Sequence, residues 1–354
     1  MEEIENSKST EIQEEAIDLS LCANCKSKSF EEGFPTKLCA DCREYFINYP
    51  IPKWIWLFSA LILLIMAVGI FRMPKYISAA YHLSKAEKAG DKKAYLTAQR
   101  ELMLVLEKFP DNIDANANLL IASAHNHNYV LSNIAYQNIA EKEIKDNDLF
   151  KNIQNSMELL NADFPADTAL YGRIKINKDS TENMMRIYDH LAYQNNIDQY
   201  IAGVYIADML YDRKLYDEAD KLLTKVLLTN QNYYPALVIL IGVKRNLKQY
   251  DEAIEICNQI LAENTEDVSV IAQKSRTELK RSNDTKAAEY AAEAMSLNPD
   301  DIYAMESQAL VDYYANRKTE CKKLITKIKI AEQGGDPIIS NRIEQIISGK
   351  IPYR

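Results

Sequence analysis

The chain has 354 residues, a formal net charge of −9 at pH 7, and 47% hydrophobic against 26% charged residues. This balance is typical of a folded protein rather than of a disordered chain. Nine glycines and ten prolines are too few for a turn-rich all-β fold. An acidic chain lacks the basic face that general nucleic-acid binding requires, so no nucleic-acid partner is expected.

An acidic segment opens the sequence. Residues 1–20 carry six glutamates and Asp18 against the single cation Lys8, and they have no hydrophobic period. Such a segment cannot bury enough apolar surface to fold, which predicts a disordered, solvated tail.

Two CxxC pairs follow within residues 21–47. Thirteen residues separate the pair Cys22 and Cys25 from the pair Cys39 and Cys42. Each pair places two sulfurs on one tight turn, so two facing turns supply four thiolates to one Zn²⁺ at ~2.3 Å. A segment this short has no hydrophobic core, so metal binding would drive its folding. We predict one structural zinc ion; two redox pairs or two disulfides are the alternatives.

The predicted module resembles a zinc ribbon or a short treble-clef finger. Many ribbons turn left-handed at a glycine just after the second cysteine of each pair, whereas Lys26 and Arg43 stand there in this chain. This departure leaves the subtype open. Four cysteines close the coordination sphere, so no open catalytic position is expected on the metal.

Residues 54–71 form an apolar run without a charge. As a helix the run spans ~27 Å, close to the ~30 Å hydrocarbon core of a bilayer. Trp54 and Trp56 at one end are typical of a membrane interface. We predict one transmembrane helix over 54–73 that ends at Pro74, and hence a single-pass protein of the cell membrane.

A 34-residue repeat dominates the rest of the chain. Leu-Tyr-Asp-Glu-Ala at 215–219 recurs as Gln-Tyr-Asp-Glu-Ala at 249–253, and the same period continues to Ala287 and Cys321. Apolar or small residues follow each of these small residues at +4 and +7. One helix pair cannot bury both its apolar faces, so pairs stack around a continuous core and leave a concave groove.

This pattern resembles the tetratricopeptide repeat (TPR) family, whose helix–turn–helix unit has the same period. The family's small residue in the second helix matches Ala219, Ala253 and Ala287, and its terminal proline matches Pro299. The resemblance implies an all-α fold, a TPR-type α-solenoid of antiparallel helix pairs.

The resemblance covers residues 76–330 and is strongest over 200–330, with 331–354 as a closing helix or tail. Before residue 200 the repeats diverge, and an inserted helix near 147–163 would explain a copy that is out of phase. Ser132, Tyr136 and Ile139 form a weak copy, and Met185 marks a further unit.

The family binds its ligands through fixed positions on the first helix of each pair. Carried over to this chain, these positions are Asp208, Tyr211, Asp212, Arg245, Asn246, Arg276, Lys280, Tyr313 and Tyr314. They lack the Lys/Asn/Arg arrangement with which some TPR proteins hold a terminal carboxylate. Mixed charges among aromatic side chains predict a protein or peptide partner of mixed charge, and no small-molecule substrate.

No catalytic motif stands out in the sequence. The four histidines are scattered, and there is no Ser-His-Asp order, HExxH motif or phosphate-binding loop. Cys257 and Cys321 occupy repeat positions that suit small apolar residues, so we predict core thiols rather than nucleophiles. The chain is therefore not expected to be an enzyme.

Together these features predict a membrane-anchored protein–protein interaction scaffold. The groove would bind a partner, and the zinc module would be structural or would bind a second partner. The alternative is a membrane regulatory sensor that responds to zinc or to oxidants. Charges flanking the apolar run are balanced and do not set its orientation. Four free thiolates persist best in a reducing cytosol, which favours a cytoplasmic N-terminus and a solenoid on the far side.

Overall fold

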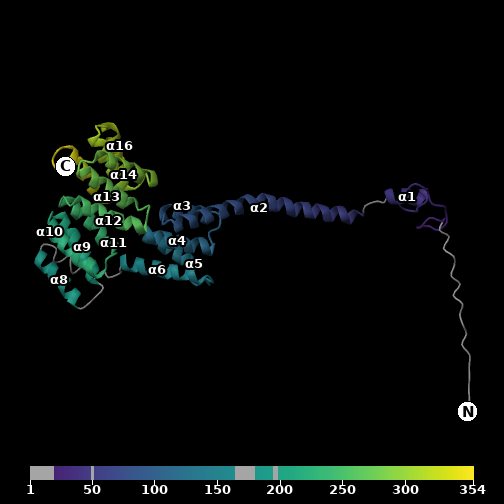
Figure 1. Ribbon diagram of the computed structural model, residues 1–354, viewed down its shortest axis with the longest axis horizontal. Helices are drawn as coiled ribbons and strands as arrows, with labels where there is room; N and C mark the ends of the chain where they lie inside the picture. The colour runs from purple at the N-terminus through teal and green to yellow at the C-terminus, as the bar shows by residue number, and fades with distance from the viewer. Residues whose placement is uncertain (1–19, 49–51, 164–179, 194–197) are drawn as a thin grey trace, which may run out of the picture. The chain divides into compact units, whose positions relative to one another are not determined.

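The computed structural model describes residues 20–48, 52–163, 180–193 and 198–354 (Figure 1). Except for Ser20, the predicted acidic tail lies outside these ranges. The chain divides into two compact units, Met1–Pro74 and Lys75–Arg354.

The first unit contains a cysteine-bearing loop, a short helix and most of an apolar helix. Helix α1 (Ala40–Ile47) follows the loop. Helix α2 (Lys53–Asp91) starts after Pro52 and continues past the boundary of the unit. Within the described residues, α2 is the one helix that is long and apolar enough to cross a membrane, and its apolar window is not buried against the rest of the chain.

The prediction that Pro74 ends this helix is wrong, because α2 continues through it to Asp91. Proline removes one i→i−4 hydrogen bond and can kink a helix without ending it when later turns are held by packing. Ala79, Ala86 and Ala89 beyond the proline are buried. The turn after α2 contains Lys93, which has a φ of 56°.

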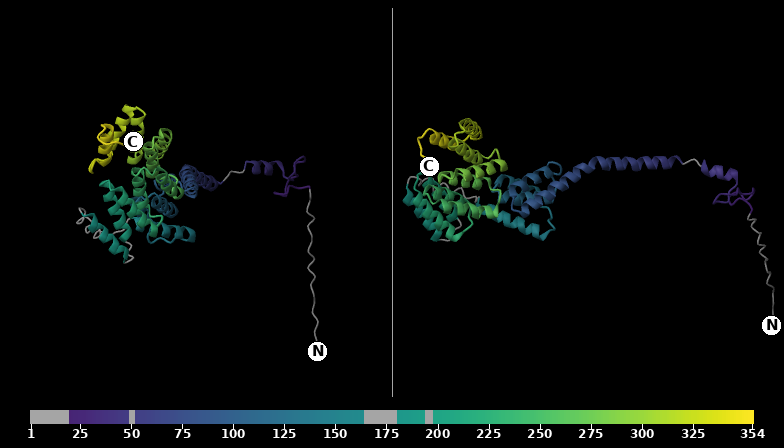
Figure 2. Two further views of the ribbon diagram at one scale, coloured as in Figure 1. Left: turned by 60° about the vertical axis from the view of Figure 1, so that its left-hand side comes forward. Right: turned by 45° about the horizontal axis from the view of Figure 1, so that its top comes forward.

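The second unit is built from antiparallel helix pairs that stack side by side (Figure 2). After α2 its helices are α3 (Tyr95–Leu106), α4 (Ile113–His125), α5 (Tyr129–Ile139), α6 (Asn147–Asp163), α8 (Thr181–Tyr193), α9 (Asp198–Asp212), α10 (Tyr216–Thr229), α11 (Tyr234–Asn246), α12 (Tyr250–Glu263), α13 (Val268–Lys280), α14 (Asp284–Leu297), α15 (Ile302–Tyr314), α16 (Lys318–Ala331) and α17 (Ile338–Ile347). The predicted all-α, TPR-type solenoid is confirmed.

The repeat period is visible in the turn within each of the last four pairs. One residue of each turn has a positive φ of 61° to 67°, and these residues are Lys214, Lys248, Ser282 and Asn316. The next residue donates its N–H to the carbonyl five positions earlier, as Leu215 does to Leu210 at 2.9 Å. This bond ends the first helix in a Schellman-type turn and reverses the chain.

Small buried residues bring the two helices of each pair close together. Ala219, Ala253 and Ala287 have no exposed surface, and Cys321 is 2% exposed. The Ser275 hydroxyl on α13 donates to the Ala287 carbonyl on α14 at 2.7 Å, so the two backbones approach closely at this point. Larger side chains there would push the helices apart.

The repeats before residue 200 depart from the regular pattern. The inserted helix predicted near 147–163 is present as α6, which packs against α4. Tyr136, predicted at a packing position, is 42% exposed. On α8 the buried face is Met184, Tyr188 and Leu191, one residue away from the predicted register at Met185, so the spacing from this helix to Ala219 is one residue longer than the repeat.

A polar seam joins the first pair to a later one. Thr265, in the turn between α12 and α13, donates its N–H to the Lys93 carbonyl at 3.0 Å. The Glu266 carboxylate accepts from the backbone N–H and the hydroxyl of Thr97, both at 2.7 Å. These contacts join segments of the chain that are distant in sequence, so the stack is braced between distant repeats as well as between neighbours.

Lys248 provides a test of the repeat turn. Its φ of 63° strains any residue with a Cβ atom, so Lys248→Gly should stabilise the chain by about 0.5–1 kcal/mol. Lys248→Val should destabilise it. Lys221→Gly, on the exposed face of α10, is the matched control and should cost about 1 kcal/mol. Urea unfolding followed by circular dichroism measures all three; a loss for Lys248→Gly as large as that of the control would contradict the assigned turn.

Candidate functional site

The four cysteines of the first unit converge. Their Sγ atoms all lie within 4.8 Å of one another, and those of Cys25 and Cys39 are 3.7 Å apart. A tetrahedral ion with sulfur ligands at ~2.3 Å holds its sulfurs ~3.8 Å apart, whereas a disulfide bond is only ~2.05 Å long. The cluster therefore has the dimensions of a metal site and could hold an ion such as zinc.

The two cysteine pairs are positioned by different local structures. Lys26 has a φ of 53° and donates its N–H to the Cys22 carbonyl at 2.9 Å, so a lysine makes the left-handed turn usually given to glycine. Cys39 is the N-cap of α1, and Arg43 lies inside that helix. The second pair therefore needs no left-handed residue, which explains the departure noted in the sequence. The helix N-terminus also favours a thiolate.

Electrostatics differ among the four thiols. Hydrogen bonds from the Ser27 side chain and backbone lower the pKa of Cys25 to about 6. A backbone hydrogen bond from Cys42 lowers the pKa of Cys39, but burial and the neighbouring thiols outweigh it and raise that pKa to about 11. Thiolates packed this closely repel one another, and a bound dication removes that repulsion.

The cysteine module has almost no apolar interior. Within residues 20–48 only Cys22 and Cys39 are buried. The remaining support is polar: the Arg43 guanidinium lies 3.6 Å from the centre of the Phe34 ring and bonds Glu31 at 3.0 Å. A bound metal ion would therefore supply most of the free energy that holds this fold together.

Metal analysis tests the cluster. The purified full chain should carry about one zinc ion per chain, and Cys39→Ser should lose it, because three thiolates hold zinc much more weakly than four. Cys321→Ser, a change to a buried cysteine of the solenoid, should leave the zinc content unchanged. A metal-free wild-type chain, or an unchanged zinc content in Cys39→Ser, would contradict the site.

The second candidate site is the surface formed by the first helices of the last four pairs. The nine predicted positions lie on α9, α11, α13 and α15. Six of them line one cavity of about 420 Å³: Tyr211, Asp212, Arg245, Asn246, Arg276 and Lys280. Asn246 links two neighbours, since its amide donates to the Tyr211 hydroxyl at 3.1 Å and accepts from Lys280 at 2.8 Å.

The other three predicted residues are not among those that line this cavity. Asp208 is exposed and lines a smaller adjoining cavity of about 160 Å³. The Tyr313 hydroxyl donates to the Ile347 carbonyl on α17 at 3.2 Å. Tyr314 packs edge-on against Tyr313, with their ring centres 5.1 Å apart.

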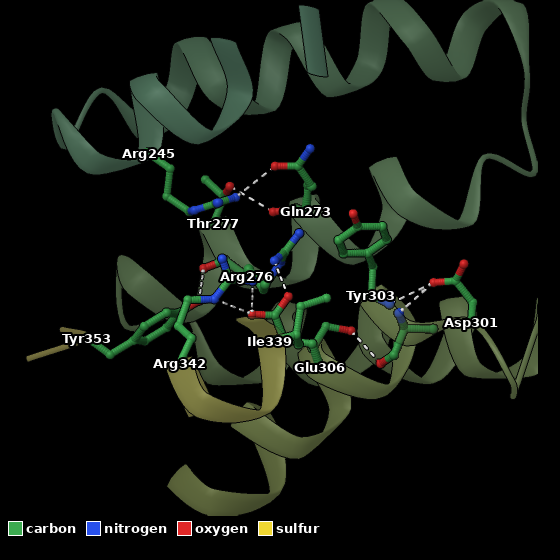
Figure 3. A network of polar contacts seen from close by, with 12 residues as sticks. Arg245, Gln273, Arg276, Thr277, Asp301, Tyr303, Glu306, Ile339, Arg342 and Tyr353 are labelled. Carbon is green, nitrogen blue, oxygen red and sulfur yellow. Dashed lines mark hydrogen bonds and ion pairs between the residues drawn. The ribbon is translucent and has the colours of Figure 1, made fainter. Parts of the chain in front are cut away.

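A buried ion network forms the base of the groove (Figure 3). Arg276 and Glu306 pair there, and they are 6% and 1% exposed. Arg342 on α17 donates its Nε to the same Glu306 carboxylate at 2.9 Å. Arg245 bonds the Gln273 amide oxygen at 3.2 Å. Arg245 and Arg276 are thus buried structural residues as well as lining residues.

Sequence reasoning missed Glu306 and Arg342. Glu306 is a single acidic residue within the largely apolar segment 302–311, which is a weak signal of a buried charge with a partner. Arg342 lies outside the repeats, so no periodic pattern could have indicated it.

The two remaining cysteines of the solenoid are core residues. Cys257 has no exposed surface and Cys321 is 2% exposed. Burial raises the pKa of Cys257 to about 12 and that of Cys321 to about 11. Both thiols stay protonated at neutral pH, as expected of packing residues.

No protein-family model and no curated protein matches the chain. Among solved structures, it is similar to a TPR protein from Parabacteroides merdae, at 15% identity over 77% of this chain and 99% of that chain, with a TM-score of 0.39. It is also similar to a Pseudomonas aeruginosa pilF structure, at 12% identity, 77% and 98% coverage and a TM-score of 0.30. A third similar structure is that of YrrB, described as a TPR protein with an unusual peptide-binding site. It is 15% identical over 51% of this chain and 100% of that chain, with a TM-score of 0.31. The solenoid assignment rests on the helix pairs and their period.

Proposed function

We propose that this chain is a membrane-anchored protein–protein interaction scaffold whose solenoid groove binds a segment of a partner protein. The observation that carries the proposal is the convergence of six predicted ligand-contact positions on one cavity of about 420 Å³. Its lining combines tyrosine rings, amides and charged groups, which are the groups that fix an extended peptide. The described part of the chain offers no arrangement of nucleophile and base that would favour catalysis.

The apolar part of α2 is the proposed anchor. The uncharged run over 54–71 matches the thickness of a bilayer, and none of the helix's apolar window is buried within the protein. A cytoplasmic N-terminus would keep the four thiols in a reducing compartment and would place the solenoid on the far side of the membrane. Anchoring would confine each end of the protein to its own face of the membrane and raise the effective concentration of the partners on that face.

The cysteine module is proposed to bind one structural zinc ion. Its four thiols leave no ligand position free for a substrate, so its contribution would be a folded surface for a second partner.

Substitutions on the groove test the scaffold function. The variant Tyr211→Ala, Lys280→Ala, Tyr313→Ala removes two side chains that line the cavity and a third predicted contact residue. All three are only partly buried, so the fold should persist. Arg276 is left intact, because removing it would strand the buried Glu306 carboxylate. Capture of the partner with the tagged full chain should fall by at least about ten-fold, a loss expected when several contact residues are removed.

The matched control changes three exposed residues at equivalent positions of successive second helices, Lys221→Ala, Glu255→Ala and Glu289→Ala. Circular dichroism should be unchanged in both triple variants. Equal capture by the groove variant and the wild type, or loss only in the control variant, would show that the groove is not the binding surface.

A further inference from the structure

The last residues of the chain lie against the predicted groove. After α17, the Lys350 N–H bonds the Gln345 carbonyl at 2.9 Å and the segment 350–354 turns back toward α13. The Tyr353 hydroxyl donates to the Arg276 carbonyl at 3.3 Å (Figure 3). Ile351, Pro352 and Tyr353 line the same cavity as the predicted contact residues.

This segment contacts two residues, Lys280 and Tyr314, that a ligand is expected to contact. The Lys280 ammonium lies 5.5 Å from the centre of the Tyr353 ring, and the ring of Tyr314 lies 6.1 Å from it. The Arg354 guanidinium stacks on Tyr314 at 4.0 Å and pairs with Asp284. An extended peptide of this chain therefore lies where a partner peptide is expected.

The cavity carries more positive than negative charge. Five lysine and arginine side chains line it against two carboxylates. Arg276 is 6% exposed, and its Nε has no hydrogen-bond partner. Partial burial, with Arg245 and Lys248 nearby, lowers the pKa of Lys280 to about 8, which reflects the same unbalanced positive potential. A ligand with carboxylates would satisfy these groups through charge-assisted hydrogen bonds.

The side chains of the segment 350–354 do not supply that charge. Arg354 is a cation that already pairs with Asp284, and Tyr353 offers the cavity a hydroxyl and a ring but no anion. Ile351 and Tyr353 are partly buried and pack against the core of the last repeats, so a competing ligand must replace these apolar contacts. An acidic peptide that does so and also supplies carboxylates would therefore bind this surface more tightly than the segment does.

We propose that the groove binds an acidic, tyrosine-bearing segment of a partner protein, and that residues 350–354 are an internal competitor which this partner displaces. The proposal rests on the proposed function, because it names the ligand chemistry of the same groove. Competition by the segment weakens the partner's binding. The apparent affinity of the partner for the chain falls in proportion to the fraction of molecules whose groove is occupied by residues 350–354.

Two labelled heptapeptides test the exchange by fluorescence anisotropy on the full chain in detergent. The first copies residues 348–354, Ser-Gly-Lys-Ile-Pro-Tyr-Arg. The second replaces its lysine and arginine with glutamate. The acidic peptide should bind the Tyr353→Ala chain at least about ten-fold more tightly than it binds the wild-type chain, because the groove of the variant is no longer occupied. On the Tyr353→Ala chain, the acidic peptide should also bind more tightly than the peptide that copies residues 348–354. Its affinity should fall with added salt.

Tyr136→Ala, a change to a 42% exposed tyrosine on α5, is the matched control and should behave as the wild type. Adding Lys280→Ala to Tyr353→Ala should weaken the acidic peptide. Equal affinity for the wild type and Tyr353→Ala would show that the segment does not compete. If the peptide that copies residues 348–354 binds more tightly than the acidic peptide, or if neither peptide binds the Tyr353→Ala chain, the proposal of an acidic ligand is wrong. Partner capture that depends on the groove would survive these failures, so the two proposals are separable.

Discussion

The solenoid depends on the close approach of the two helices within each repeat. Three alanines and one cysteine stand at this crossing, one repeat length apart, and each has 2% or less of its surface exposed. Because the crossing is repeated at a constant spacing, every first helix faces the same way as the one before it. Side chains far apart in the sequence are thereby brought to one surface, which no single helix pair could provide.

Ion pairs between neighbouring helices fix the charged side chains on that surface. The buried Glu306 carboxylate on α15 forms ion pairs with Arg276 on α13 and with Arg342 on α17, so it joins three helices. Burying charges costs desolvation free energy, which the close ion pairs and hydrogen bonds of the network offset. The network leaves one Arg276 nitrogen without a partner and the cavity with excess positive charge, and this imbalance favours an anionic ligand.

The parts that could be predicted from the sequence are local or periodic. The repeat period predicted the helix pairs and their buried small residues, and the spacing of Cys22, Cys25, Cys39 and Cys42 predicted their convergence. Nothing periodic marks a contact between distant segments. The seam between Thr265 and Lys93 and the pairing of Arg342 with Glu306 therefore remained hidden.

Two further differences have local causes. Pro74 was expected to end a helix, but packing of the following turns on α3 carries the helix through it. The turn residue Lys248 went unnoticed because the left-handed conformation is usually signalled by glycine, and here the backbone bond from Gln249 to Lys244 at 2.9 Å enforces it on a lysine. Tertiary and backbone constraints overrode the residue preference in both cases.

The proposed scaffold requires that the groove formed by the first helices, and not the outer surface of the solenoid, contacts the partner. Photocrosslinking in living cells tests it most directly, with a photoreactive amino acid placed at Asp212 in the groove or at Glu255 on a second helix, both exposed. We expect a discrete crosslinked partner from position 212 and none from position 255. Equal crosslinking from both positions, or crosslinking from position 255 alone, would contradict it.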